Sequence, residues 1–359
     1  MQATLLSTDP YSAALAFIRG EIEVEGDLVN AVRQCLGQTG GAMRRVSNLF
    51  GRLAPWRLAD LWRTRAGTAQ NIRFHYDRSN DFYRHFLDQR MVYSCAYFRH
   101  PGETLEEAQL AKLDHICRKL QLRRGQRFLD IGCGWGALVR HAAREYGAKA
   151  TGCTLSHQQT AFAIGEAASQ GLPVAIEEMD FRDMSGEFDR IASVGMFEHV
   201  GAWKLRAYFR KVAGLLAPDG VFLNHGITRP AGVPTDATSL FIARHVFPGG
   251  RIHSLGEVVE SAENAGLEIL DIENLRRHYA LTCREWVRRL RANREACLKT
   301  VDEQTWRVWQ LYLAGSAVAF EDGTLGLHQI LMARRGSAAT PMTRDYQYAN
   351  SHPSVCDNT

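Results

Sequence analysis

Three short stretches of the sequence carry residues that can bind a cofactor or move a proton. FLDIGCGWGALV places Asp130 ahead of glycines at every second position from 132 to 136. RIASVGMFEHVG ends in Glu198 and His199, and VFLNHGIT carries His225 inside an apolar run. Glycines let the backbone turn tightly against a ligand, while carboxylates and imidazoles are the usual proton carriers in catalysis. We therefore look for a ligand site where these stretches meet.

The glycine turn has the spacing G-x-G-x-G after an apolar run that ends near Asp130. A dinucleotide-binding turn would instead read G-x-G-x-x-G, with an acidic residue about 20 positions later. S-adenosylmethionine fits better, because it has no pyrophosphate and its ammonium can pair with a carboxylate at a strand end. The alternative is a turn whose glycines serve packing alone. The residues expected to bind the cofactor here are Asp130, Gly132, Cys133, Gly134, Trp135 and Gly136.

Two later stretches would contact the rest of this cofactor. Where many methyltransferases carry an acid for the ribose hydroxyls, this chain has neutral residues, of which Thr154 and Gln159 can hydrogen-bond those hydroxyls. In MDFRDM, Asp180 can accept from the adenine amino group and Phe181 can cover the ring. The alternative for MDFRDM is a polar turn with one core aromatic residue.

The elements that position these residues follow from the hydrophobic pattern. We expect helices over 105–122, 157–171 and 205–220, the last closed by a Pro-Asp-Gly turn. Strands are expected just before the glycine turn and over 148–156, 174–180, 188–197 and 221–228. Alternating strands and helices predict an α/β fold with a parallel sheet, in which ligands bind at the carboxyl ends of the strands. Glu198 and His225 can then converge on one crevice.

Composition limits the class of protein. The chain has 359 residues, 45% of them hydrophobic, and a net charge of +4, too small to indicate nucleic acid. We expect a helical N-terminal domain over 1–66, a catalytic domain over 67–335 and a polar, loosely ordered tail over 336–359. No apolar run reaches the roughly 20 residues of a membrane helix, no signal peptide is evident, and the eight cysteines form no C-x-x-C pair. A cytoplasmic protein without a metal site is predicted.

From about residue 71 to 334 the chain resembles the cyclopropane fatty acid synthase and mycolic acid cyclopropane synthase family. The resemblance rests on FHYDRSNDFYRHFLDQRMVYSCAYF, LDIGCGWG, TLSHQQ, GMFEHVG, HVFPGGRIHSL, LRRHYALTCREW and YLAGSAVAFEDGTLGLHQ. It implies a Rossmann-like class I methyltransferase sheet, mostly parallel, with helices on both faces and helical insertions over the acyl site. It also implies methyl transfer from S-adenosylmethionine to a cis double bond of a phospholipid acyl chain, followed by proton loss and ring closure.

The resemblance assigns roles to further residues. It implies a bound bicarbonate ion as the base, held by the side chains of Glu198, His225 and Tyr279 and by the backbone of Cys95 and Ile227. It also implies that Tyr93 and Ser94 bind the cofactor. A carboxylate repels an anion, so Glu198 would share a proton with bicarbonate or orient His225.

Purely structural roles remain as alternatives for these residues. Glu198 can cap the next helix, and His225 can be a satisfied core histidine. The segment around Tyr93 and Cys95 can be an aromatic core turn, and His199 is expected to pack or cap.

One position departs from the family pattern. The family has a cysteine in GCA near its carboxyl end, and this chain has Ser316 in YLAGSAVAF. An unassisted serine hydroxyl is a much weaker nucleophile than a thiolate. If the reaction persists, covalent catalysis at Ser316 is not its mechanism.

The expected acyl substrate places the enzyme at a membrane. The segment Arg284–Lys299 carries six basic and two acidic residues and could dock on anionic lipid, making the protein peripheral at the inner membrane face. The alternative is a solvated helix packed on the catalytic core. A homodimer is a further possibility. Competing functions are a methyl or methylene branch on the acyl chain, N-methylation of a small amine, or cofactor binding without catalysis.

Overall fold

The computed structural model describes residues 10–37, 80–201, 204–232, 252–337 and 341–348. Within these residues eight strands form one sheet in the order β3-β2-β1-β4-β5-β8-β7, with β6 beside β5. The strands are β1 Arg127–Ile131, β2 Lys149–Thr154, β3 Ala175–Glu178, β4 Phe188–Val194, β5 Leu216–Arg229, β6 His253–Ser254, β7 Leu267–Asn274 and β8 Gly326–Arg334. The pairs among β1 to β5 are parallel, whereas β8 runs antiparallel between β5 and β7.

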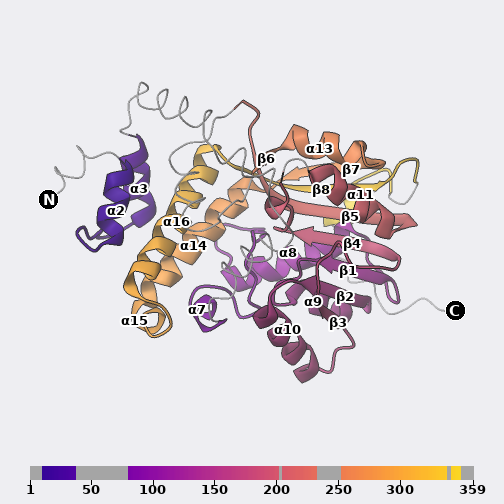
Figure 1. The fold of residues 1–359 in the computed structure, drawn as a ribbon, viewed down its shortest axis with the longest axis horizontal. Coiled ribbons are helices and arrows are strands. Elements are labelled where there is room, and N and C mark those ends of the chain that lie inside the picture. The colour runs from indigo at the N-terminus through magenta and orange to yellow at the C-terminus, as the bar shows by residue number, and fades with distance from the viewer. Residues whose placement is uncertain (1–9, 38–79, 202–203, 233–251, 338–340, 349–359) are drawn as a thin grey trace.

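Helices cover both faces of the sheet (Figure 1). Alternate strand residues point to opposite faces. On one face, Phe128 and Leu331 pack with α8 (Leu105–Lys119) and α9 (Ala137–Tyr146). On the other, Leu129 and Ile330 pack with α11 (Leu205–Leu215) and α13 (Leu255–Glu263). The helix α10 (His157–Ser169) connects β2 to β3. This arrangement confirms the predicted α/β methyltransferase fold.

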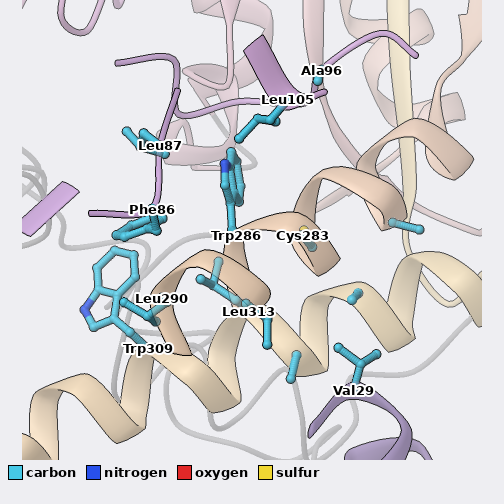
Figure 2. Packing of buried hydrophobic residues seen from close by; sticks show 14 of the residues in the cluster. Val29, Phe86, Leu87, Ala96, Leu105, Cys283, Trp286, Leu290, Trp309 and Leu313 are labelled. Atoms are coloured by element: carbon cyan, nitrogen blue, oxygen red, sulfur yellow. The ribbon is translucent and has the colours of Figure 1, made fainter. Parts of the chain in front are cut away.

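A third cluster of buried residues lies beyond the carboxyl ends of the parallel strands. It joins α14 (Arg276–Ala292) and α16 (Glu303–Asp322) to α7 (Asn80–Arg84) and α3 (Leu28–Gly37). In Figure 2 the side chain of Trp286 from α14 extends to Leu105, and Phe86 lies against Trp309 of α16. The short α15 (Arg294–Cys297) connects the two long helices.

The N-terminal helices α2 (Pro10–Ile18) and α3 pack against α16. Arg307 of α16, with an exposed fraction of only 4%, donates to the carbonyl of Phe17 at 3.1 Å and also binds Glu23. The region described here is helical, as expected for the N-terminal part. The proposed boundary at residue 66 lies outside the described residues.

Two element boundaries differ from the sequence-based prediction. β4 ends at Val194 because Gly195 adopts φ +70°, so Glu198 sits in the short 3-10 turn η2 (Phe197–His199) rather than at the strand end. The helix expected to reach residue 220 ends at Leu215. The Pro-Asp-Gly sequence instead lies within β5, where the pairing with β4 shifts register.

The described part of the polar tail contains the short helix α17 (Asp345–Tyr348), which packs on α8. Gln347 is buried, and its carbonyl accepts from Arg118 Nε at 3.1 Å. Arg344 pairs with the buried Asp271 at 2.7 Å. This stretch is therefore packed rather than loosely ordered.

Candidate active site

The carboxyl ends of β1, β2 and β4 open into a cavity of about 510 Å³. This size suits a nucleoside-containing small molecule. Of the residues predicted to bind the cofactor, all but Gly136 line it, namely Tyr93, Ser94, Asp130, Gly132, Cys133, Gly134, Trp135, Thr154, Gln159, Asp180 and Phe181.

The glycine turn forms the wall of the cavity next to β1. Gly132 has φ +77° and Gly134 has φ +54°, a region that favours glycine. The amide of Gly132 donates to the carbonyl of Cys153 at 2.9 Å, which ties the turn to β2. Gly136 faces away from the cavity at the start of α9, where a Cβ would lie 2.9 Å from Cβ of Ala163. Its role is close packing between α9 and α10.

Asp130 is the residue before the last in β1 and has an exposed fraction of 3%, and its Oδ1 has no hydrogen-bond partner among the described residues. Burial raises the pKa of Asp130 to about 7, and the nearby charge of Lys112 opposes that rise. A buried carboxylate with an unused oxygen favours a cation beside it. The ammonium group of S-adenosylmethionine meets that need, so the residues present fit this cofactor.

The residues predicted to contact the ribose and the adenine already use part of their hydrogen-bonding capacity on neighbouring side chains. Thr154 Oγ1 donates to Gln159 Oε1 at 2.7 Å, which leaves the Gln159 amide donor for a ligand. Asp180 Oδ1 accepts from Arg182 Nε at 2.8 Å, so part of its acceptor capacity is already used. Phe181 packs edge-on against Tyr208, with ring centroids 5.5 Å apart.

Sequence reasoning missed Lys112 of α8, which lines the same cavity with an exposed fraction of 2%. Its Nζ donates to Ser94 Oγ at 2.9 Å. Burial lowers the pKa of Lys112 to about 8. The signal was present in the sequence, because Lys112 falls on the apolar stripe that contains Ala108 and Ile116.

A second group of predicted residues gathers around the end of β5. Glu198 Oε1 accepts a hydrogen bond from the amide of Ile227 at 2.7 Å. Gly226 allows this approach, because a Cβ there would lie 2.0 Å from Phe197 and 3.2 Å from Glu198 Oε1. Burial raises the pKa of Glu198 to about 7, although the Ile227 hydrogen bond opposes the rise. This carboxyl group can therefore gain or lose a proton near neutral pH.

Tyr279 interacts electrostatically with both Glu198 and Cys95. Burial raises the pKa of Tyr279 well above its usual range, and the nearby Glu198 carboxylate raises it further. Its hydroxyl therefore stays protonated and can donate. The ring stacks on Phe320, with centroids 4.5 Å apart. Cys95 is fully buried, and burial raises the pKa of its thiol well above the usual range, so it is neutral.

His225 lies in β5 two residues before Ile227, so the two side chains share one face of the sheet. Its Nδ1 lies 3.1 Å from Gln329 Nε2, and its buried Nε2 has no hydrogen-bond partner among the described residues. Burial lowers the pKa of His225 well below its ordinary value, so the ring is neutral. Accepting from the Gln329 amide places the proton on Nε2 as a donor without a partner.

The remaining predicted site residue lies on α16 one turn from Phe320, the residue on which the ring of Tyr279 stacks. Ser316 is 6% exposed on α16, next to the buried Ala317 and Gly315, and does not line the cavity. The side chain of His199 lies outside the described part of the structure.

The chain is similar to known proteins over most of its length. A family model described as mycolic acid cyclopropane synthetase matches residues 63–330. The chain belongs to this family. A probable fatty acid methyltransferase of Pseudomonas putida is 43% identical and spans 93% of this chain and 85% of that protein. Cyclopropane-fatty-acyl-phospholipid synthase of Escherichia coli K12 is 38% identical over 72% of this chain and 66% of that protein.

A solved structure supports the same family assignment. Mycolic acid cyclopropane synthase CmaA1, complexed with SAH and CTAB, aligns with a TM-score of 0.71 and 35% identity, covering 74% of this chain and 97% of that one. This family member is thus an S-adenosylmethionine-dependent methyltransferase. Its family acts on lipid acyl chains. The predicted resemblance is confirmed.

Proposed function

We propose that this family member transfers the methyl carbon of S-adenosylmethionine to a cis double bond of a phospholipid acyl chain and completes a cyclopropane ring. The cofactor supplies an electrophilic methyl group, and the alkene π pair forms the new C–C bond while the C–S pair stays on sulfur. The carbocation then loses a proton from the added methyl group, and the C–H electron pair closes the ring. The protein must exclude water and accept that proton.

The single observation that carries the proposal is Glu198, a buried carboxyl group tied to the Ile227 amide at 2.7 Å. Glu198 does not itself line the cofactor cavity, but Met196 and Val200, two residues before and after it, do. Its pKa of about 7 lets it exchange a proton at neutral pH. A group with such a pKa suits general acid–base catalysis. A structural helix cap would be solvated and ionised instead.

We assign the proton to a bicarbonate ion held between Glu198, His225 and Tyr279. The unpartnered Nε2–H of His225 and the protonated hydroxyl of Tyr279 are donors suited to an anion. Glu198 shares a proton with the ion, which removes the repulsion between two negative charges. The backbone of Cys95 completes the proposed anion site. The amide of Ile227 already donates to Glu198 at 2.7 Å, so in this scheme Ile227 acts by holding that carboxyl group. Ser316 has no role in this scheme, since an unassisted serine hydroxyl is a weak nucleophile.

A second candidate is favoured by the 43% identity to a probable fatty acid methyltransferase. The same cation, after a hydride shift, can lose a methyl proton to form a methylene branch. The ring and this branch have the same mass. N-methylation of a small amine is supported less well than either lipid reaction. The coclaurine N-methyltransferase structure is only 20% identical to this chain and shares the fold alone.

Membrane docking through the predicted segment Arg284–Lys299, which spans parts of α14 and α15, receives little support from the geometry. Arg284 pairs with Asp27 at 3.1 Å, Arg289 with Glu106 at 2.6 Å, and Arg294 with Glu303 at 2.9 Å. No helix in the described part of the chain is long and apolar enough to cross a bilayer. We propose a peripheral enzyme on anionic membranes, with docking surfaces other than these paired arginines.

The deciding experiment incubates the full chain with S-adenosylmethionine and vesicles of a monounsaturated phospholipid. We expect one acyl chain to gain the mass of a CH₂ unit, and proton NMR to show cyclopropyl protons. Vinylidene protons would support the second candidate instead. Methylation of an added small amine, with unchanged lipid, would refute both.

A further inference from the structure

Lys112 is a buried cation without an ion pair. Its exposed fraction is 2%, and among the described residues no carboxylate lies within the 4.0 Å that defines an ion pair around its Nζ. Lys119, two turns later on α8, is equally buried but lies 2.6 Å from Glu273 and 3.7 Å from Asp271. Burying a charge is costly unless it is paired. Lys119 is ion-paired and Lys112 is not, although both lie on one helix. This difference indicates that Lys112 binds an anion that the chain does not itself supply.

The hydrogen-bond arrangement points that anion into the cofactor cavity. An ammonium has three donors, and one is used on Ser94 Oγ at 2.9 Å. Since Ser94 Oγ accepts from Lys112, its own hydrogen must point elsewhere. Both side chains line the cavity. Together they have three remaining donors and a positive charge to offer to a carboxylate.

Asp130 supplies the opposite charge in the same cavity. It is the one other charged residue that is buried among the described residues lining the cavity, and its Oδ1 is unpartnered. Asp130 and Lys112 interact electrostatically but form no ion pair. A cavity with a separate buried anion and cation matches a zwitterion. The amino acid end of S-adenosylmethionine is such a group.

We infer that Lys112, acting with Ser94, binds the carboxylate of the cofactor's methionyl group, while Asp130 binds its ammonium. This inference rests on the cofactor of the proposed function and not on the acyl product. The competing explanation is that Lys112 merely balances the charges of Asp88 and Asp130 within the scaffold. Asp88, however, already accepts from the amides of Val92 at 2.8 Å and Arg90 at 3.2 Å.

The test compares two ligands that differ only in the carboxylate, S-adenosylmethionine and decarboxylated S-adenosylmethionine. Calorimetry measures their dissociation constants for the wild type and for Lys112→Met, Ser94→Ala and Lys119→Met, without any acyl substrate. A charged hydrogen bond contributes enough that we expect Lys112→Met to weaken S-adenosylmethionine roughly ten- to hundredfold, with decarboxylated ligand changed less than about twofold. Ser94→Ala should reduce the same preference in part.

Lys119→Met is the matched control, since it removes a buried lysine from the same helix outside the cavity. It should lower stability but keep the wild-type preference for the carboxylate. Equal weakening of both ligands by Lys112→Met, or an unchanged preference, overturns the inference. If Lys112→Met fails to fold, an unchanged preference in Ser94→Ala overturns it as well. Failure of the wild type to bind S-adenosylmethionine at all would refute the cofactor itself, which the other outcomes do not.

Discussion

Gln329 of β8 faces His225 of β5 in the antiparallel register, and its amide nitrogen lies 3.1 Å from Nδ1 of the imidazole. Because the side-chain amide donates, the ring proton is fixed on Nε2. Glu273 of β7 is the partner of Gln329 on the other side, so the three side chains form a row across the sheet. Gln329 is a positioning residue that sequence reasoning did not identify.

Replacing Gln329 with Leu should free the imidazole to exchange tautomers. We expect turnover to fall about tenfold, as for loss of a buried hydrogen bond, with cofactor affinity unchanged. Nitrogen NMR of labelled histidine should show both His225 nitrogens moving toward averaged shifts. Shifts identical to those of the wild type would show that Gln329 does not set the tautomer.

Glu198→Gln should remove the exchangeable proton while keeping the side chain's shape. We expect turnover to fall about a hundredfold or more, the usual contribution of a general acid or base. Binding of S-adenosylmethionine, measured by calorimetry, should persist. Glu187→Gln, an exposed change at the opposite end of β4, is the control and should turn over normally. Normal turnover in Glu198→Gln would eliminate the proposed proton transfer.

The same carboxyl group should make stability depend on pH. Its folded pKa of about 7 lies above the ordinary value of 4.5, so the folded state binds the proton more tightly than the unfolded state. This contribution is fully present below about pH 4.5 and is lost as the pH rises through about 7, amounting to about 3 kcal/mol at most. Urea unfolding of wild type and Glu198→Gln at several pH values measures it. The variant should lose stability less steeply over this range, and parallel curves would contradict the assignment.

Gly226→Ala should disturb the contact between η2 and β5. The new Cβ would lie 2.0 Å from Phe197, so the chain must shift, at a cost of about 2 kcal/mol or more. The control is Gly214→Ala in α11, where no atom lies within 4 Å and helix propensity should add up to about 1 kcal/mol. Denaturant unfolding compares the two. Equal stability for both variants would refute the close packing.

Arg307→Met should loosen α2 from α16. The guanidinium binds the Phe17 carbonyl at 3.1 Å and also contacts Glu23 and Glu303. Hydrogen exchange over residues 10–24 should accelerate about tenfold or more, as expected for loss of charged hydrogen bonds. Arg288→Met, which removes an exposed arginine whose ion-pair partner in the described part of the chain is Glu285, should leave exchange there unchanged. Slow exchange in both variants would show that other contacts hold α2.

The parallel half of the sheet was predictable, because its strands and helices show strong periodicity and the glycine turn marks the end of β1. The end of β4 was not, since Met196 and Phe197 continue an apolar run that only the positive φ of Gly195 interrupts. The Pro-Asp-Gly segment gives a turn signal in isolation, yet here tertiary pairing draws it into β5.

The sequence motifs predicted most of the glycine-turn residues that line the cavity, whereas they did not point to Lys112, which lines it too. Lys112 lies in a regular helical pattern, and only its burial beside Ser94 reveals a function. Arg284 and Arg289 illustrate the converse. Their charge suggests a lipid-binding surface, but the partners Asp27 and Glu106 come from distant segments that local pattern cannot pair with them.

The position of β8 also bears on how the protein is made. This strand is the last of the sheet in the chain but lies inside it, between β5 and β7. During translation, β1 to β5 can pair before residue 326 leaves the ribosome, so the glycine turn can form early. His225 acquires its partner only when β8 inserts. A nascent or truncated chain ending before Gly326 would therefore have the cavity at the ends of β1, β2 and β4. It would lack the partner of His225 and would leave an unfilled gap beside β7.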